Sequence, residues 1–509
     1  MSFGSFMSLG SFPSRKALSR LWLTILATTV LAGAVLRFLF PGDVPFGGDE
    51  AFALVLGGDW LQHPRIVLHG MSSSAGVPNP PLSVYFFAGI YALSRGDPQT
   101  ASMVVMGWNV AGLILAGMWL HGRRTTLGPF WAWWVLAFLC VHPWSILLSR
   151  KIWAQDLLMP FVVIACWGLE GIWADRWRWK RVGAGVAAAL IVSQIHISGI
   201  FWVVALAVGL AVYWPRAERR RIPAFLLLTG GIFLVLYTPW FIHLIREGSG
   251  YHPAPGETGR AGYLWNALCG IVSLLGVWSG HEWSLRYFFF TPEEAAQFYH
   301  TIEAHLRLWL LTIMLTGWQL MALPVITVRM IRRGKVAGTA TDTTNPFLLS
   351  LFLFLLLVVL PGGTVYPHYG AVLIVPAAIL LAQALIALES RRKDRFKERF
   401  GERFRDLDPT RFSVCIGVLM MLWASLSFLA HIHSTGGTLG DYGATLRVKQ
   451  EKIAEMRREG TKCLSPSAPL EYYYLLDRLQ GVRTRLEDHP SPFVEPSEQA
   501  VRQPLKGAS

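Results

Sequence analysis

The sequence predicts an all-α polytopic membrane protein with about eleven transmembrane helices. Three observations predict this class. Of the 509 residues, 53% are hydrophobic and 15% are charged, which is less charge than a soluble chain of this length carries. Apolar runs long enough to cross a bilayer recur along the chain. The Lys and Arg residues lie mainly between these runs, in the pattern that sets the orientation of membrane proteins.

The apolar runs set the order of the predicted helices. They cover 21–40, 99–120, 129–148, 157–174, 183–194, 197–213, 222–241, 306–328, 346–361, 370–388 and 411–430. The first run is longer than the core of a usual signal peptide, so we expect it to be retained as a helix. The 183–213 stretch is divided because Ser193-Gln194-Ile195-His196 is a polar break. Basic clusters on both flanks, Arg176–Arg181 and Arg216–Arg221, also require two crossings if both face the cytoplasm.

The distribution of charge predicts the domain organisation. Residues 1–20 form a cytoplasmic N-terminus, and 21–430 form the transmembrane module. With this orientation every basic cluster falls on the cytoplasmic side. The extracytoplasmic side receives a first loop, 41–98, a second large loop, 242–305, and a small C-terminal domain with its tail, 431–509.

Local patterns predict structure inside these outer segments. In the first loop, 51–62 is typical of a surface helix, and 81–94 is apolar but too short to span comfortably. In the C-terminal domain, 441–460 has the charge spacing of a helix, and Tyr472-Tyr473-Tyr474 is typical of a strand. The last 20 or so residues are polar and contain Pro, which favours disorder.

Composition also limits the classes of function. The net charge of +14 would suggest nucleic acid in a soluble chain, but the membrane topology explains it here, so no nucleic-acid partner is expected. The five Cys residues form no CxxC pair, and neither a metal knuckle nor a disulfide framework is implied. Membrane lipids are the expected surroundings.

The first candidate site is the acidic pair Asp49-Glu50, which follows the first apolar run in the first loop. Two carboxylates at a membrane surface suggest a general base or a metal ligand. The alternative is structural, because Asp before Ala-Phe-Ala-Leu is also typical of a helix N-terminus.

The second candidate site is the tight outer turn from Ser149 to Asp156. Arg150 and Lys151 break the positive-inside pattern, and a basic pair here suits the phosphate of a lipid-linked substrate. The alternative is contact with lipid phosphates by snorkelling. Asp156 is a carboxylate at the membrane edge, which by default suggests function.

Two further positions complete the candidate set. Gln194 and His196 lie at the polar break, where a single His is more often a hydrogen-bonded structural residue than a ligand. Tyr366, His368 and Tyr369 lie at another outer turn. They suit a sugar or isoprenoid contact, with an interfacial aromatic belt as the alternative.

At these positions the chain resembles the GT-C superfamily of membrane glycosyltransferases, and is similar to bacterial members of the protein O-mannosyltransferase and lipid A aminoarabinose transferase type. The resemblance covers most of 20–390. It rests on the order of four motifs: Asp49-Glu50-Ala51-Phe52, Asn79-Pro80-Pro81-Leu82, the Arg150 to Asp156 turn, and Tyr366-Pro367-His368-Tyr369 followed by Pro376.

The resemblance implies an inverting glycosyltransferase of the bacterial inner membrane whose active site faces the periplasm. The donor is a polyprenyl-phosphate sugar, and the acceptor is a lipid, glycan or protein. Asp49 maps to the catalytic base, with Glu50 as its neighbour, and Asp156 maps to the second acid. A direct displacement needs one essential carboxylate, and a phosphate leaving group needs cationic stabilisation more than protonation.

The chain departs from the family at two positions that bear on the donor phosphate. Asn79 and Gln194-Ile195-His196 stand where relatives carry a positive charge. The candidate phosphate ligands are therefore Arg150, Lys151, His196 and Arg260, and Asn79 and Gln194 join Tyr366, His368 and Tyr369 as substrate contacts. No cofactor is required by this chemistry. A divalent cation stays open, if the loops bring Asp49, Glu50, Asp156 and His196 together.

Two other classes of function remain. A transporter or flippase of a lipid-linked glycan would keep charge inside its helix bundle and show internal repeats, and no repeat is evident in this sequence. A lipid-binding or polymer-assembly subunit without catalytic activity would tolerate loss of both Asp49 and Asp156.

Overall fold

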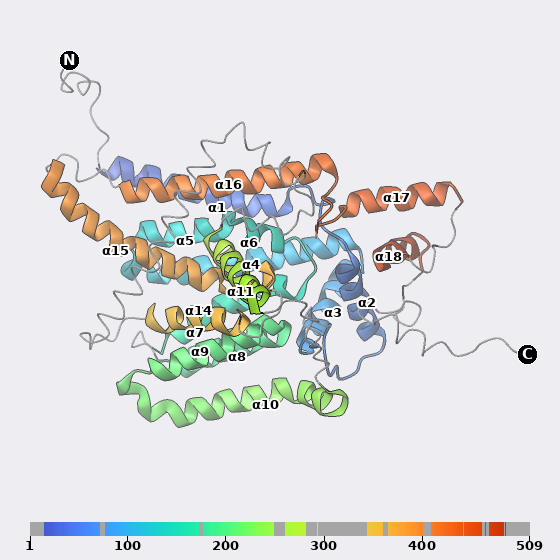
Figure 1. The fold of residues 1–509 in the computed structure, drawn as a ribbon, viewed down its shortest axis with the longest axis horizontal. Helices are drawn as coiled ribbons and strands as arrows, with labels where there is room; N and C mark the ends of the chain where they lie inside the picture. Colours follow the sequence, from blue (N-terminus) through green and yellow to red (C-terminus); the bar gives the residue numbers. More distant parts are fainter. Residues whose placement is uncertain are drawn as a thin grey trace, which may run out of the picture.

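The computed structural model describes most of the chain as one assembly of helices (Figure 1). The described residues are 15–71, 77–172, 177–248, 260–280, 293, 344–359, 365–400, 409–440, 442–460, 464, 468–482 and 484. Within them there is no β-strand, and β-pairing is limited to two isolated bridges. The predicted all-α class is confirmed. The predicted span 306–328 lies outside the described residues.

The helices follow one another with short connections. In chain order they are α1 (Arg15–Phe38), α2 (Gly48–Gln62), α3 (Leu82–Ser94), α4 (Pro98–Leu127), α5 (Pro129–Val141), α6 (Pro143–Leu148), η2 (Ala154–Leu157), α7 (Met159–Glu170), α8 (Trp179–Ile195), α9 (Ile197–Val212), η3 (Arg216–Arg221), α10 (Ile222–Glu247), α11 (Arg260–Ser279), α14 (Thr344–Val359), η5 (Pro367–Leu373), α15 (Ile374–Phe400), α16 (Pro409–Thr435), α17 (Leu446–Arg458) and α18 (Leu470–Leu479). Here η denotes a 3₁₀ helix.

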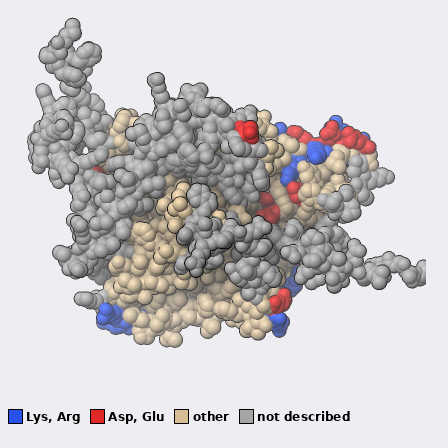
Figure 2. Space-filling view, in the orientation of Figure 1, with Lys and Arg blue, Asp and Glu red and all other residues tan. Residues whose placement is uncertain are grey.

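Several of these helices can cross a membrane. Five spans among the described residues are long and apolar enough: Ser19–Phe38, Pro98–Arg124, Glu218–Glu247, Pro367–Ile386 and Thr410–Thr435. On the face shown in Figure 2, charged side chains gather toward the two ends of the molecule, and the described surface between them carries few. The protein is therefore a multi-pass membrane protein. The count of about eleven spans stays a prediction.

The break predicted at residues 193–196 is confirmed. α8 ends at Ile195, His196 adopts an extended conformation, and α9 begins at Ile197. A Cβ on Gly199 would lie 2.5 Å from the carbonyl oxygen of Val192, so only glycine allows the two helices to approach this closely at their junction.

In the first loop, the apolar 81–94 segment is α3, which packs against α2 and α4. The structure differs from the predicted outer segments in two places. The second large loop, 242–305, holds the end of α10 and the 20-residue helix α11. Tyr472–Tyr474 is helical and belongs to α18, so the predicted strand is wrong. The reason is amphipathic spacing: Tyr474 and Leu475 are buried while Leu479 on the same helix is exposed.

Figure 1 shows where the outer elements lie. α2, α3, α17 and α18 gather at one end of the helix assembly, at the right of the view. The first loop and the C-terminal segment are therefore at the same end of the protein. That this side is extracytoplasmic stays a prediction from the charge pattern.

Candidate functional site

The acidic pair lies in the first turn of α2. Glu50 is 2% exposed, and its Oε2 accepts the backbone N–H of Gly47 at 2.7 Å. This bond satisfies one of the N–H groups that every helix leaves free at its start, and it fixes the direction of the carboxylate. Asp49 is half-buried in the same turn. The two neighbours therefore differ: Glu50 points into the protein, and Asp49 is the more accessible of the two.

Lys151 brings a positive charge to Glu50 from the turn between α6 and α7. Its Nζ lies 3.6 Å from Glu50 Oε1, and the two side chains are 1% and 3% exposed. The same Nζ lies 3.1 Å from the centre of the Trp153 ring, which is cation–π geometry. The buried ammonium therefore has an anion on one side and an aromatic face on another.

Asp156 is the third charged residue of the site. Its Oδ2 accepts the backbone N–H of Trp153 at 3.1 Å, and its Oδ1 has no hydrogen-bond partner among the described residues. Burial raises the pKa of Asp156 well above its usual range, Lys151 and the Trp153 N–H act in the opposite direction, and Glu50 adds to the rise. We call Glu50, Lys151 and Asp156 the charged cluster.

The turn that carries Asp156 is held by α4. Asn109 Nδ2 donates to the carbonyl oxygen of Asp156 at 2.8 Å, and Trp108 Nε1 donates to that of Leu157 at 3.0 Å. These bonds pair backbone groups in a short 3₁₀ segment whose carbonyls have few partners of their own. The carboxylate of Asp156 is thereby presented from a rigid support.

Aromatic side chains from three separate segments stand beside the charged cluster. The rings of Trp153 and His368 have centroids 5.4 Å apart, and those of His196 and Tyr369 are 5.8 Å apart. Tyr366 stacks on His368 at 5.5 Å with an interplanar angle of 10°. We call these five residues the aromatic wall. It joins the α6–α7 turn to the α8–α9 break and to the start of η5.

Asn79 and Gln194 lie next to the aromatic wall, at the α8–α9 break. Asn79 is 5% exposed; its Oδ1 accepts the N–H of Ile197 at 2.9 Å, and its Nδ2 donates to the carbonyl of Met71 at 3.0 Å. Both ends of this amide therefore brace the first loop against the start of α9. Gln194 is 1% exposed, and its Nε2 has no hydrogen-bond partner among the described residues.

Known proteins share this arrangement of helices. No protein-family model and no curated protein matches the sequence. The structure is similar to that of ArnT from Cupriavidus metallidurans bound to undecaprenyl phosphate, with a TM-score of 0.51 and 13% identity over 89% of this chain and 84% of that chain. The protein has a GT-C fold. The fold predicted from the four ordered motifs is confirmed.

A second GT-C structure extends the comparison to archaea. The archaeal oligosaccharyltransferase AglB from Archaeoglobus fulgidus, in complex with an inhibitory peptide and a dolichol-phosphate, matches with a TM-score of 0.50 and 12% identity. The match covers 94% of this chain and 61% of that chain, so this chain spans about three fifths of the length of AglB.

Arg150 has different partners in the structure from the phosphate that the sequence suggests. It is fully buried, and its guanidinium donates to the carbonyl oxygens of Arg37, Leu39 and Phe40 at 2.6 to 2.9 Å, with longer bonds to those of Leu36 and Asp43. These carbonyls belong to the end of α1 and the residues that follow it. The geometry favours a structural role, in which Arg150 caps the C-terminus of α1, over a contact with phosphate.

The other predicted site residues divide into two groups. The structure brings together Glu50, Lys151, Asp156 and the predicted aromatic residues, with Asp49 in the adjoining position. The side chain of Arg260 lies outside the described residues. Trp153 lies in the same turn as Lys151 and was not singled out from the sequence, because its cation–π contact with Lys151 shows only in the folded structure.

The described residues do not build a metal site. No group of three His, Cys, Asp or Glu side chains among them is placed to hold a metal ion. In the charged cluster, the position between the carboxylates is already taken by the ammonium group of Lys151.

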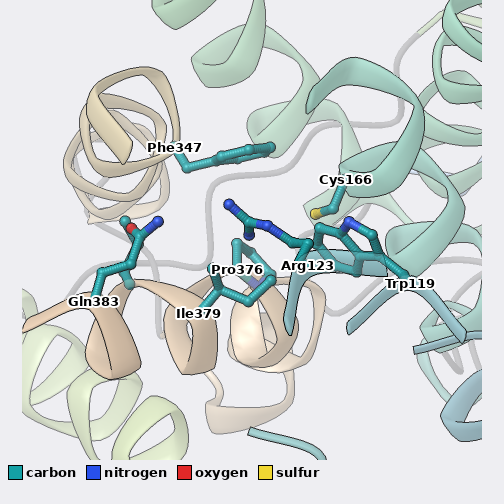
Figure 3. Close-up of a pocket in the computed structure, with 8 residues that line it drawn as sticks. Trp119, Arg123, Cys166, Phe347, Pro376, Ile379 and Gln383 are labelled. Atoms are coloured by element: carbon teal, nitrogen blue, oxygen red, sulfur yellow. The ribbon is translucent and has the colours of Figure 1, made fainter. Parts of the chain in front are cut away.

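Figure 3 shows a separate pocket in the bundle, with about 250 Å³ of empty space. It lies between α4, α7, α14 and α15, and Arg123 and Gln383 are its polar lining residues. Arg123 pairs with Glu170 at 2.8 Å, so its charge is already balanced. Asn109 and Trp119 are ten residues apart on α4, and this spacing puts the pocket about 15 Å from the charged cluster.

Proposed function

We propose that this protein is an inverting glycosyltransferase that moves a sugar from a polyprenyl phosphate to an acceptor hydroxyl at the extracytoplasmic face of the membrane. One observation carries the proposal: an acid pair from the first loop meets a buried lysine and a second acid from the α6–α7 turn, beside an aromatic wall. The GT-C fold supports it, because the ArnT structure is bound to undecaprenyl phosphate and the AglB structure to a dolichol-phosphate.

Asp49 is the proposed base because it is the accessible member of the pair. Its carboxylate accepts the proton of the acceptor hydroxyl while the acceptor oxygen bonds to the anomeric carbon. The bond between that carbon and the phosphate oxygen breaks, and its electron pair leaves with the polyprenyl phosphate. A single displacement of this kind inverts the anomeric centre and needs one base.

Lys151 is the proposed cation for the leaving group. Its ammonium lies between the acid pair and the aromatic wall, and a phosphate bound there would share the charge that Lys151 now directs at Glu50. A buried cation acts strongly on a developing phosphate charge, because little water screens it. Glu50 then serves to hold Lys151 in place, and Asp156 adjusts the local charge.

The aromatic wall is the proposed contact for the sugar ring. Tyr366 and Tyr369 are half-buried, so each keeps part of its surface open, and both border His196 or His368. Faces of aromatic rings suit the apolar face of a sugar, and phenolic hydroxyls suit its polar edge. The identity of the sugar is set here and not at the acid pair.

The test is Asp49→Asn in purified protein supplied with undecaprenyl-phosphate mannose or undecaprenyl-phosphate aminoarabinose. The release of undecaprenyl phosphate is measured, since this product forms whatever the acceptor is. A positioned general base contributes roughly 100- to 10,000-fold in rate, so we expect a loss of at least about 100-fold. Binding of undecaprenyl phosphate, measured by native mass spectrometry, should persist in this variant and weaken in Lys151→Met.

Asp59→Asn is the matched control, because Asp59 lies in the same helix and pairs with Arg65 on its exposed side. It should release product at the wild-type rate. Wild-type activity in Asp49→Asn would remove Asp49 as the base. Transport of an intact lipid-linked sugar across vesicles, with no release of polyprenyl phosphate by the wild type, would instead identify a flippase.

A further inference from the structure

The C-terminal segment is bound along the strip of the first loop that leads to the acid pair. Leu446 donates its N–H to the carbonyl of Val44, and Arg447 donates to that of Gly42, both at 2.9 Å. Pro45 and Thr445, next to the Val44–Leu446 pair, form an antiparallel bridge. Segments about 400 residues apart in sequence are thus paired by their backbones, a few residues before Asp49.

Side chains reinforce this pairing around Asp43. Its carboxylate, 4% exposed, accepts Arg447 Nε at 2.8 Å and pairs with His433 Nδ1 at 2.5 Å. Tyr442 donates its hydroxyl to the Asp43 carbonyl at 2.8 Å. The strip therefore has little freedom to move independently of α16 and α17.

Lys449, on α17, reaches the Phe46–Gly47 peptide group, where α2 begins. Its Nζ donates to the carbonyl oxygen of Phe46 at 2.7 Å and to Glu471 Oε1 on α18 at 2.8 Å. Its side chain is 8% exposed and that of Glu471 is 10% exposed. A buried ammonium with two close acceptors is a strong, directional donor.

The peptide that accepts Lys449 is the same one that donates to Glu50. The carbonyl of Phe46 and the N–H of Gly47 belong to a single planar peptide group, and that N–H donates to Glu50 Oε2 at 2.7 Å. Three hydrogen bonds form a chain from Glu471 to Lys449, from Lys449 to the peptide and from the peptide to Glu50, and Glu50 forms an ion pair with Lys151. Hydrogen bonds in such a chain polarise one another, and a cation on the carbonyl strengthens the N–H donor.

We propose that Lys449 is a positioning residue for the acid pair, acting through the Phe46–Gly47 peptide. It does not touch the substrate. It holds the first turn of α2 so that Glu50 faces Lys151 and Asp49 faces the acceptor. Glu471 fixes Lys449 in turn. The expected change in kcat rests on the proposed function. The expected effect on the first turn of α2 rests on the geometry alone.

The experiment compares Lys449→Met with Lys449→Arg, Glu471→Gln and the control Lys452→Met. Lys452 is on the same helix, but its Nζ lies 5.4 Å from the Tyr472 ring centroid, and it has no bond to the described part of the first loop. A misplaced catalytic group costs up to about 100-fold, so we expect kcat of Lys449→Met to fall about 10- to 100-fold. The KM for undecaprenyl-phosphate mannose should change less than about 3-fold.

The other variants test whether the effect depends on the bond from Lys449 to the Phe46 carbonyl. Lys449→Arg should regain part of the kcat, because it still donates to the Phe46 carbonyl, and Glu471→Gln should show a smaller loss. Lys452→Met should match the wild type. A variant with lower thermal stability but unchanged kcat per folded molecule would show a merely structural role and overturn the proposal.

A second measurement separates this inference from the proposed function. Hydrogen exchange of the peptide covering 42–52 is followed without substrate. Lys449→Met and Glu471→Gln should speed exchange there, while exchange in α4 and α7 stays unchanged. Unchanged exchange at 42–52 in both variants overturns the positioning role. Faster exchange together with a wild type that releases no polyprenyl phosphate keeps the positioning role and rejects the proposed function.

Discussion

Arg150 and Lys151 are adjacent and both buried, yet their charges are balanced in different ways. Arg150 donates to backbone carbonyls after α1, where the helix dipole favours a cation. Lys151 faces a carboxylate and an aromatic ring. The planar, forked guanidinium suits several carbonyls at once, whereas the compact ammonium suits a single carboxylate and the face of one ring. The chemistry of the side chain thus matches its position at each residue.

The role of Arg150 leads to a prediction about stability. Arg150→Met leaves the carbonyls of Arg37, Leu39 and Phe40 without their buried donor, so we expect a loss of about 3 kcal/mol or more. Thermal unfolding in detergent, followed by size-exclusion chromatography, measures it. The stability of Arg150→Lys should lie between that of the wild type and that of Arg150→Met, because an ammonium cannot reach as many carbonyls.

The control for Arg150 is Arg65→Met, since Arg65 is 57% exposed and bonds to Asp59 at the surface. Its change should be below about 1 kcal/mol. If Arg150→Met instead unfolds like the wild type and loses affinity for undecaprenyl phosphate, Arg150 is a phosphate ligand as the sequence suggested.

At the scale of elements, α7 and α8 approach each other through two glycines. A Cβ on Gly168 would lie 2.4 Å from the Cα of Gly185, and one on Gly185 would lie 2.8 Å from the Cα of Gly168. Small residues at such a crossing let the backbones approach closely, which is how membrane helices gain packing without a hydrophobic driving force. α7 begins just after the turn that carries Asp156, and α8 ends at the α8–α9 break. The close approach of the two helices therefore keeps the break beside the turn.

Gly168→Ala tests this crossing. The added methyl meets backbone atoms that cannot rotate away, so we expect a loss of about 1 to 3 kcal/mol in thermal unfolding. Gly183→Ala on the same helix α8 is the matched control, because its Cβ would meet Leu228 Cδ2 at an ordinary 3.7 Å. It should be neutral or slightly stabilising. Equal effects of the two substitutions would contradict a tight α7–α8 crossing.

At the scale of the whole molecule, the first loop and the C-terminal segment lie together at one end of the helices (Figure 1). α4 leads from this end toward Arg124 in its last turn. The basic clusters predict that the end with Arg124 faces the cytoplasm. With that orientation, the charged cluster would lie at the outer boundary of the membrane, where the proposed donor and acceptor would meet.

Cysteine labelling checks this orientation. In a background with Cys269 and Cys463 replaced by Ser, a membrane-impermeant maleimide should label Gln62→Cys and Glu459→Cys in intact spheroplasts. Arg124→Cys should react only after permeabilisation. All three positions are exposed in the structure, so burial cannot account for a difference. If only Arg124→Cys were labelled in intact spheroplasts, the orientation would be the opposite of the predicted one.

The sequence was sufficient for features that depend on local pattern. Apolar runs and basic clusters predicted the membrane class, and the polar break at Gln194 predicted the α8–α9 junction. Features that depend on contacts between distant parts of the chain could not be predicted from the sequence. The partner carbonyls of Arg150 lie more than 100 positions earlier in the chain, and Lys449 shows no local signal that it meets Phe46. The strand prediction for Tyr472–Tyr474 was wrong because three aromatics favour a strand locally, whereas the burial of one face of α18 favours a helix.

The pairing of residues 42–46 with 445–449 has a consequence for the timing of biogenesis. Roughly 400 residues separate the two segments, and at about 5 to 20 residues per second their synthesis is separated by about 20 to 80 s. During that interval the first loop has been made but lacks its partner. If Lys449 positions the acid pair, catalytic competence is acquired only when the last part of the chain reaches the outer side. An unfinished chain in the membrane then cannot discharge lipid-linked sugars that the cell has already spent energy to make.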